Sequence, residues 1–169
     1  MLRFVFRELL FETIAPAFIL ALLITHFVGE KTEVLGHSME PSLYQDQQLI
    51  VDKVSYRFHL PARGDIVIVD VPDSDIPLIK RVIGLPGETV EIRGGRVLID
   101  GQLLDEPYLG EVMQSDFGPV EAPLDHLFVM GDNRNASRDS RSIGPVPLDW
   151  ILARAWVRVW PFDEFGLLE

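Results

Sequence analysis

A long apolar segment near the N-terminus constrains the fold of this chain more than any other feature. Residues 14–28 read IAPAFILALLITHFV and carry no formal charge unless His26 is protonated. Extended back to Leu9, the segment includes Glu12 and reaches about the 20 residues that a helix needs to cross a bilayer. It is apolar on all sides, whereas a helix that packs on a protein core shows one apolar stripe. We therefore expect a transmembrane helix at about residues 9–28.

Two other interpretations of the segment are a cleaved signal peptide and a buried core helix. Arg3 and Arg7 would suit the charged start of a signal peptide, but the segment ends in His-Phe-Val and lacks the small residues of an A-x-A cleavage site. A buried helix stays an alternative because Glu12 and Pro16 interrupt the apolar run. A retained anchor explains the pattern best.

The charges on either side of the segment predict its orientation. Two arginines precede it, whereas Glu30, Lys31 and Glu33 follow it with a single positive charge. By the positive-inside rule, the N-terminus then lies in the cytoplasm. We expect a single-pass protein of the plasma membrane, with an anchor at residues 1–30 and an extracytoplasmic domain at residues 31–169.

After the anchor, short runs of β-forming residues alternate with turn signals. Six runs read as strands: 48–54, 65–71, 89–93, 96–100, 126–130 and 153–160. Gly94-Gly95 joins two of them as in a two-residue hairpin, and residues 85–88, LPGE, are typical of a turn. Residues 107–123 show few strand signals and should form an exposed loop. We predict one mainly β domain, an antiparallel sheet or barrel-like fold.

Composition excludes several classes of function. The formal charge of -11 disfavours nucleic acid, which binds basic surfaces. The absence of Cys excludes disulfides, thiolate nucleophiles and Cys-ligated zinc. The four His residues show no HExxH-like pairing, so we expect neither a metal site nor a cofactor.

Three short segments carry residues that could do chemistry. Residues 36–43, GHSMEPSL, place Ser38 in an irregular segment, where a Ser alone would be interpreted as a turn former. Residues 131–141, GDNRNASRDSR, suit either a solvated surface loop or a rigid wall beside a site. The third segment, residues 78–88, contains Lys80 among apolar neighbours.

Lys80 lies at the start of a predicted strand. If side chains alternate, Lys80 shares a face with Leu78 and Val82, and Arg81 points the other way. A buried Lys lowers its pKa, and the neutral amine can then take a proton from a hydroxyl. The alternative is a solvated strand face that carries both Lys80 and Arg81, and the segment on its own favours that alternative.

Together the three segments resemble type I signal peptidases in order, spacing and sequence. SMEPSL is similar to the family's nucleophile segment, IKRVIGLPGE to its general-base segment, and GDNRNASRDSR followed by IGPV to its C-terminal segment. The run AWVRVWP also resembles the family's ending. The resemblance spans nearly the whole chain and implies a membrane-bound serine endopeptidase that removes signal peptides from secreted precursors.

The resemblance implies a role for each motif residue. Ser38 would be the nucleophile and Lys80 the general base, as in Ser-Lys catalysis. The supporting residues would be Ser137, which would hydrogen-bond to the Lys80 amine, Asp132, and the ion pair of Asp139 with Arg141. The backbone N–H of Ser38 would donate to the oxyanion. Gly36 stands where many family members carry a second hydroxyl donor, so a backbone group or water would have to replace that donor.

Substrate choice also follows from the resemblance. The family cleaves after small residues at the first and third positions before the scissile bond, in Ala-X-Ala fashion. Shallow apolar pockets would exclude larger side chains by overlap. Their walls would come from Val34, Met39, Leu43, Leu78 and Ile79, and an extended substrate would add as a strand near Ile79. The expected partners are secretory preproteins and membrane lipid, and a further candidate is the protein translocation channel.

Other interpretations remain open. A self-cleaving repressor-type protease also uses Ser and Lys, but it would carry a DNA-binding domain where this chain has the apolar segment. A catalytically silent membrane-anchored β domain would bind secreted proteins, although Ser38, Lys80 and Ser137 are all present. A mitochondrial inner-membrane peptidase shares the mechanism. A Ser-His-Asp triad through His126 has no supporting motif, and His37 neighbours the serine and so points to the opposite side of an extended segment.

Overall fold

The computed structural model describes residues 9–17 and 29–168. Within the first stretch, Leu9–Ile14 forms the π-helical segment η1, and residues 15–17 continue as α-helix. Most of the transmembrane helix expected at residues 9–28 lies outside the described residues. Among the residues that are described, no helix is both long and apolar enough to cross a bilayer.

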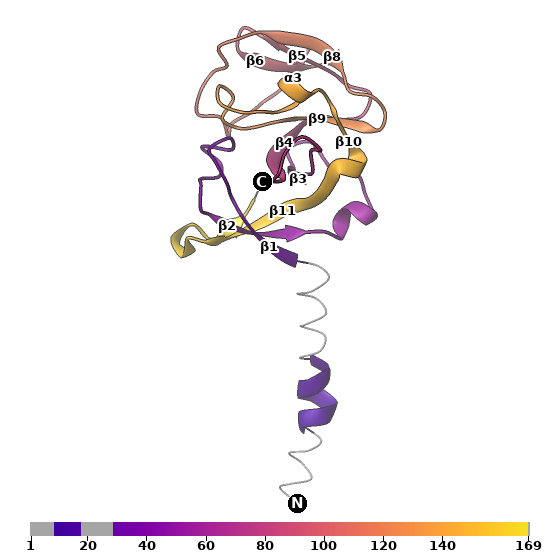
Figure 1. Cartoon of the computed structure of the whole chain (residues 1–169), viewed down its shortest axis with the longest axis vertical. Helices are drawn as coiled ribbons and strands as arrows, with labels where there is room; N and C mark the ends of the chain where they lie inside the picture. Colours follow the sequence, from indigo (N-terminus) through magenta and orange to yellow (C-terminus); the bar gives the residue numbers. More distant parts are fainter. Residues whose placement is uncertain (1–8, 18–28, 169) are drawn as a thin grey trace, which may run out of the picture.

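Two antiparallel sheets form the body of the protein, and Figure 1 shows the smaller one above the larger one. The strands of the larger sheet follow the order β1 (Gly29–Glu33), β2 (Gln48–Asp52), β11 (Ile151–Trp160), β3 (Ile66–Val69), β4 (Leu78–Gly84), β9 (His126–Met130) and β10 (Val146–Pro147), and β12 (Gly166–Leu167) pairs with β11. All four residues of β3 are buried. The centre of the larger sheet is therefore covered on both faces.

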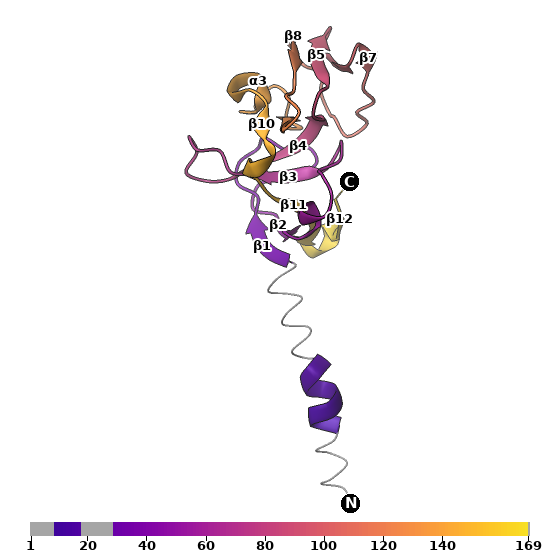
Figure 2. The ribbon, with the colours of Figure 1, turned by 90° about the vertical axis from the view of Figure 1, so that its right-hand side faces the viewer.

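The smaller sheet follows the order β7 (Gln102–Leu103), β6 (Arg96–Ile99), β5 (Thr89–Arg93) and β8 (Phe117–Glu121), and in Figure 2 it again lies above β4. Its hairpin turns at Gly94 and Gly95, whose φ angles are 57° and 76°. Both angles are positive, as a type I′ turn requires, and Arg93 pairs with Arg96 across the turn. The predicted Gly-Gly hairpin is confirmed.

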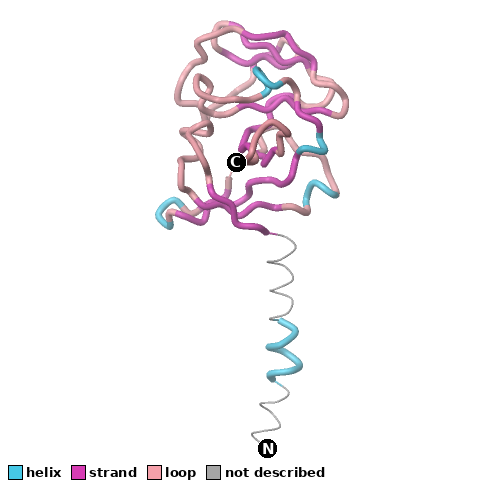
Figure 3. The backbone as a smooth tube through the Cα atoms, viewed as in Figure 1, coloured by secondary structure: helices cyan, strands magenta, loops and turns pink. Residues whose placement is uncertain are grey.

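Short helical turns interrupt the connections of the β body, and Figure 3 shows them in cyan. They are η2 (Ser55–Arg57), α3 (Ser140–Ile143), η3 (Leu148–Trp150) and η4 (Phe162–Glu164). Asp139 caps α3, because its side chain accepts the N–H of Arg141. The loop that follows β9 therefore ends in a capped turn.

Strand alternation distributes the apolar side chains between two core layers. From β9, Phe128 and Met130 pack with side chains of β5 and β6 between the sheets. Leu127 and Val129, which point the other way, pack with β3 on the opposite face. Gly84 lets the sheets approach each other, since a Cβ there would overlap side chains of β5 and β9.

The predicted mainly β, antiparallel class is confirmed, and each of the six predicted strands ends within two residues of its expected bounds. The predicted loop at residues 107–123 is wrong in part, because Phe117–Glu121 forms β8. The sequence did not predict this strand because Gly118 and Pro119 are residue types that are uncommon in strands. Gly118 has a φ of 82° and lies where the pairing with β5 shifts between Val90 and Ile92. The glycine therefore accommodates a bulge and does not end the strand.

Candidate active site

Ser38 lies in the irregular segment that links β1 to β2. Its neighbours are anchored in the core, since Met39 is 1% exposed and Leu43 is 0% exposed. The N–H of Leu43 donates to the carbonyl of Met39 at 2.9 Å, which closes one turn just after the serine. Burial of apolar side chains thus fixes the backbone that presents Ser38.

Lys80 extends from β4 to the hydroxyl of Ser38. Its Nζ lies 2.7 Å from Ser38 Oγ and donates to the carbonyl of Ile79 at 2.7 Å. Lys80 is 2% exposed and Arg81 is 1% exposed, so the alternative of a solvated strand face is wrong. The fold brings together two residues that are 42 positions apart in the sequence.

Burial changes the acid–base behaviour of Lys80. Desolvation of the ammonium lowers the pKa of Lys80 to about 8, although the negative charges of Asp139 and Asp132 oppose the change. A useful fraction of the amine is then neutral close to neutral pH. A neutral amine within hydrogen-bond distance of a hydroxyl is placed to accept its proton.

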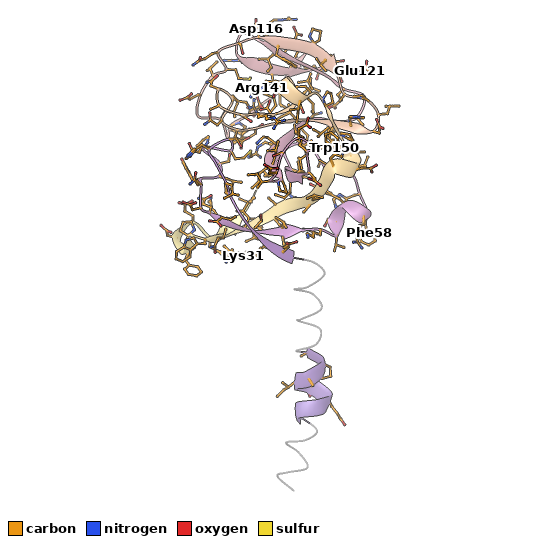
Figure 4. The ribbon with its side chains drawn as sticks, viewed as in Figure 1. Lys31, Phe58, Asp116, Glu121, Arg141 and Trp150 are labelled. Atoms are coloured by element: carbon orange, nitrogen blue, oxygen red, sulfur yellow. The ribbon has the colours of Figure 1, made fainter. Side chains whose placement is uncertain are left out.

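Asp139 and Arg141, the latter labelled in Figure 4, form an ion pair in the loop after β9. Nε and Nη2 of Arg141 each donate to the carboxylate at 2.8 Å, and the N–H of Gly131 donates to it at 3.0 Å. Burial raises the pKa of Asp139, but the hydrogen bonds and charge of Arg141 outweigh burial and hold that pKa below its ordinary value. The pair that we expected is therefore present, and it joins the two ends of the loop.

Asp132 forms a second, fully buried ion pair with Arg81. Nε donates to Oδ1 at 2.9 Å and Nη2 donates to Oδ2 at 2.8 Å. The guanidinium also donates to the carbonyl of Gly64 and lies 4.0 Å from the ring centroid of Tyr108. Arg81 was missed as a site residue because alternation turns it away from Lys80. It does point away, but into the protein and not into solvent.

Ser137 differs from its expected arrangement. Its hydroxyl is buried and has no hydrogen-bond partner within the described parts of the chain, so the expected bond to the Lys80 amine is absent. The hydroxyl lies close enough to Asp139 to help lower the pKa of that carboxyl, but without the geometry of a hydrogen bond. In its present position Ser137 packs against Gly131, where a Cβ would overlap both the Ser137 hydroxyl and the carbonyl of Ser38.

An apolar cleft of about 170 Å³ opens beside Ser38 and Lys80. Among the predicted wall residues, Leu78 and Ile79 line it. The other three do not, because Val34, Met39 and Leu43 lie in a buried cluster against which Ile79 packs. The wall residues that the sequence did not reveal include Leu35, Ile68, Ile76 and Pro77. Leu35 is 57% exposed and Ile76 is 48% exposed, and such exposed apolar side chains are visible only in the folded chain.

Strand β4 has an uncovered edge at this cleft. β3 pairs with it along Leu78 to Arg81, but β9 pairs with it only from Arg81 onward. Within residues 9–17 and 29–168, no strand covers the second edge of residues 78–80. The backbone there is available to an added strand.

Among the described histidines, His37 and His126 pair with carboxylates, and His59 Nδ1 lies 3.0 Å from the carbonyl oxygen of Leu60. His37 Nδ1 lies 2.8 Å from a carboxylate oxygen of Glu40, and His126 Nδ1 lies 2.6 Å from one of Asp125. His126 begins β9, whereas the loop beside Ser38 follows its end, so about 16 Å of strand separates them. In the part of the chain that the structure describes, no three His, Asp or Glu side chains form a group that could hold a metal ion.

Comparison with protein-family models gives a match over residues 7–160, to the family described as signal peptidase, peptidase S26. The chain belongs to this family. It is a serine peptidase.

Relatives of this S26 peptidase support the assignment. It is 45% identical over 165 residues to signal peptidase I of Leptolyngbya laminosa, covering 93% of this chain and 81% of that one. It is 42% identical over 165 residues to signal peptidase I T of Bacillus subtilis, covering 90% and 85%. A crystal structure of a signal peptidase I from Enterococcus faecalis matches with a TM-score of 0.52 at 34% identity, over 57% of this chain and 97% of that one.

Proposed function

We propose that this S26 peptidase is a membrane-bound signal peptidase that removes signal peptides from secreted precursors, with Ser38 as nucleophile and Lys80 as general base. The observation that carries the proposal is the 2.7 Å contact between Ser38 Oγ and the Nζ of a buried lysine. A serine hydroxyl becomes a good nucleophile only beside a base, and a lysine can act as that base only when its pKa is lowered.

Acylation begins when neutral Lys80 accepts the Ser38 proton as Oγ attacks the scissile carbonyl carbon. The carbonyl of Ile79 takes one N–H of the amine, which leaves the nitrogen lone pair for Ser38. The Lys80 ammonium then gives its proton to the leaving amine as the C–N bond breaks, and the signal peptide stays on Ser38 as an ester. Water, deprotonated by Lys80, hydrolyses the ester and restores both groups.

The oxyanion would be bound by the backbone N–H of Ser38. No acceptor among the described residues takes this N–H. Gly36 adopts a φ of 82°, which favours glycine, and it offers no hydroxyl as a second donor. Binding of the oxyanion would therefore depend strongly on the orientation of the Ser38 N–H.

The charged loop after β9 has a supporting role in this scheme. Its two ion pairs, Arg81 with Asp132 and Arg141 with Asp139, hold the loop against β4 and close it on itself. We infer that the Ser137 hydroxyl accepts a hydrogen bond from the Lys80 ammonium that forms during the reaction. The reason is that this buried hydroxyl has no other partner among the described residues.

Cleavage specificity would come from the apolar cleft. A substrate strand that pairs with the open edge of β4 would direct alternate side chains to one face of the sheet, and the cleft that receives them is lined by Leu78 and Ile79. The cleft of about 170 Å³ is lined mainly by apolar side chains, which suits small apolar residues of a substrate. The preference for Ala-X-Ala sequences is part of the proposal because of the family resemblance, and exclusion of larger side chains would come from overlap with the cleft walls.

The membrane location rests on the apolar segment at residues 9–28 and on the arginines that precede it. With the N-terminus in the cytoplasm, residues 31–169 would face the outer side of the plasma membrane. Anchoring would raise the effective concentration of the enzyme near membrane-bound preproteins. Lipid and the protein translocation channel are the further partners that we propose.

A cleavage assay tests the proposal. The full chain in detergent micelles is incubated with a secretory precursor that carries Ala at both specificity positions, and mass spectrometry locates the cut. We expect one cut after the second Ala, lost in Ser38→Ala and in Lys80→Ala while both variants stay folded by circular dichroism. Near-normal turnover by Ser38→Ala would refute the nucleophile, and a folded wild type that never cuts, with or without lipid, would favour a catalytically silent binding domain.

A further inference from the structure

Asn133 binds the backbone on both sides of Ser38. Its side-chain Nδ2 donates to the carbonyl of His37 at 3.1 Å, and its backbone N–H donates to the carbonyl of Ser38 at 3.0 Å. The reaction scheme above uses neither bond. Two hydrogen bonds from one residue to consecutive carbonyls nevertheless fix the position of the nucleophile's backbone.

The first of these bonds helps to fix where the N–H of Ser38 points, together with the backbone N–H of Glu40, which donates to the same His37 carbonyl at 3.3 Å. The peptide bond between His37 and Ser38 is trans, and in a trans peptide the C=O and the N–H point in opposite directions. Because the His37 carbonyl points at Asn133, the N–H of Ser38 points away from the loop of residues 131–135. The same residue, Ser38, lines the apolar cleft together with Lys80.

Gly131 makes this close approach possible. A Cβ at Gly131 would overlap the carbonyl oxygen of Ser38, so any other residue would push the loop away from the serine. With glycine there, Asn133 comes within hydrogen-bond distance of the Ser38 segment. The loop thus meets the nucleophile through its backbone and through one amide side chain.

We propose that Asn133 is a positioning residue for the oxyanion hole, and that its amide holds and polarises the peptide group whose N–H binds the oxyanion. A hydrogen bond accepted by the carbonyl of a peptide group strengthens the N–H of the same group as a donor. Because Gly36 supplies no hydroxyl, that N–H carries a larger share of oxyanion binding. The inference rests on the proposed function and adds a residue to its machinery.

Kinetics of matched alanine variants test the role. In Asn133→Ala we expect kcat for precursor cleavage to fall by about 10- to 100-fold, with KM changed by less than about threefold, because the substrate cleft is untouched. Asn135→Ala is the control, since Asn135 lies in the same loop but its amide donates to Glu111 and Val112. The control should stay within about twofold of wild type. Asn133→Asp, which keeps the shape and loses the donor, should resemble Asn133→Ala.

A pair of inhibitors separates oxyanion binding from a general defect. A substrate-like peptide aldehyde reacts with Ser38: Oγ bonds to the aldehyde carbon, the serine proton passes to Lys80, and the oxygen becomes negative. The matching peptide alcohol fills the same cleft without forming this oxygen. In Asn133→Ala the inhibition constant of the aldehyde should rise by about the same factor as kcat falls, and that of the alcohol should not change.

The ratio of the two inhibition constants does not depend on how much of a variant is folded. The positioning role would be overturned if the wild-type enzyme is active and Asn133→Ala changes neither kcat nor the ratio of the aldehyde and alcohol inhibition constants. An equal rise of both inhibition constants would also overturn it, because the residue would then support the cleft as a whole. Absence of cleavage by wild type would instead refute the proposed function on which the inference rests.

Discussion

Lys80 is subject to opposite demands from folding and from the proposed chemistry. A charged amine that is 2% exposed destabilises the folded state, and the pKa of about 8 expresses that cost. The same desolvation supplies the neutral amine that a general base requires. Burial of this one residue therefore weakens the fold and prepares the site.

The rate of cleavage should rise with pH through an ionisation near 8. Below this pH the Lys80 amine is protonated and cannot accept the Ser38 proton, whereas above it the amine is neutral. A pH–rate profile of kcat/KM with a short soluble peptide measures this ionisation in the free enzyme. A profile that stays flat between pH 6 and pH 10 would contradict the role of Lys80 as base.

Lys80→Met should abolish cleavage and stabilise the protein at pH 7. A fall of the lysine pKa from 10.5 to about 8 on folding corresponds to about 3 kcal/mol of destabilisation at neutral pH. The unfolded chain binds the Lys80 proton more tightly than the folded chain does. The free energy of unfolding of the wild type therefore increases as the pH rises from about 8 to 10.5. The variant has no lysine at this position and should not show this increase. Urea unfolding at pH 7 and pH 10 should show the difference between the two proteins shrink by about 2 kcal/mol. A difference that does not change with pH would argue against a buried charge.

Ser38 and Lys80 could be found in the sequence because their neighbours form recognisable segments. Their contact could not be found there, since it depends on the register that pairs Lys80 with Val67 and on the turn that presents Ser38. Arg81 and Asn133 were missed for the same reason. Their partners are a buried carboxylate and a backbone carbonyl from distant parts of the chain.

The site is a seam between strand β4 and the loop that follows β9, and one ion pair crosses it. Arg81 and Asp132 have side chains that are 2% and 0% exposed, and they share three hydrogen bonds. Such a pair adds little stability over apolar residues of the same size, but loss of one partner leaves a buried charge alone. The seam is therefore sensitive to changes on either side.

Arg81→Met should lower the free energy of unfolding by about 3–5 kcal/mol, because Asp132 would stay buried without its partner. Arg93→Met is the matched control. Arg93 pairs with Glu91 at the surface, where its side chain is 67% exposed, and its loss should cost less than about 1 kcal/mol. Urea unfolding of both variants measures the contrast. Equal losses in the two variants would show that the buried pair does not hold the seam.

Strands were predictable where apolar alternation or turn residues marked them, and missed where neither did. β1 reads GEKTE, and among the described strands it pairs only with β2, so as an edge strand it is largely exposed and carries no apolar pattern. β8 was missed because Gly118 serves a bulge. Leu35 and Ile76 reach the cleft from loops. Hydrophobic periodicity in a sequence predicts helices and strands, but it does not predict where the side chains of loops lie.

The apolar N-terminal segment and the cleft would act on the same substrates, because a preprotein is held at the membrane by its own signal peptide. Loss of the anchor should therefore affect substrates differently according to where they are. A membrane-bound precursor benefits from an enzyme confined to the same surface, whereas a soluble peptide does not. Loss of the segment should therefore slow cleavage of a membrane-bound precursor and leave the rate of cleavage of a soluble peptide unchanged.

The double variant Leu20→Arg with Leu23→Arg tests this coupling, since each Arg would oppose insertion of the apolar segment into a membrane by about 2.5–3.5 kcal/mol. We expect the variant to be extracted from membranes by alkaline carbonate and to cleave a membrane-bound precursor at least about 10-fold more slowly. Its kcat/KM for a soluble Ala-X-Ala peptide should stay within about twofold of wild type. Leu124→Arg, at a side chain that is 84% exposed, is the control and should behave as wild type with both substrates. If both substrates slow together, the segment supports the fold of the domain, and if neither slows, it does not anchor the enzyme.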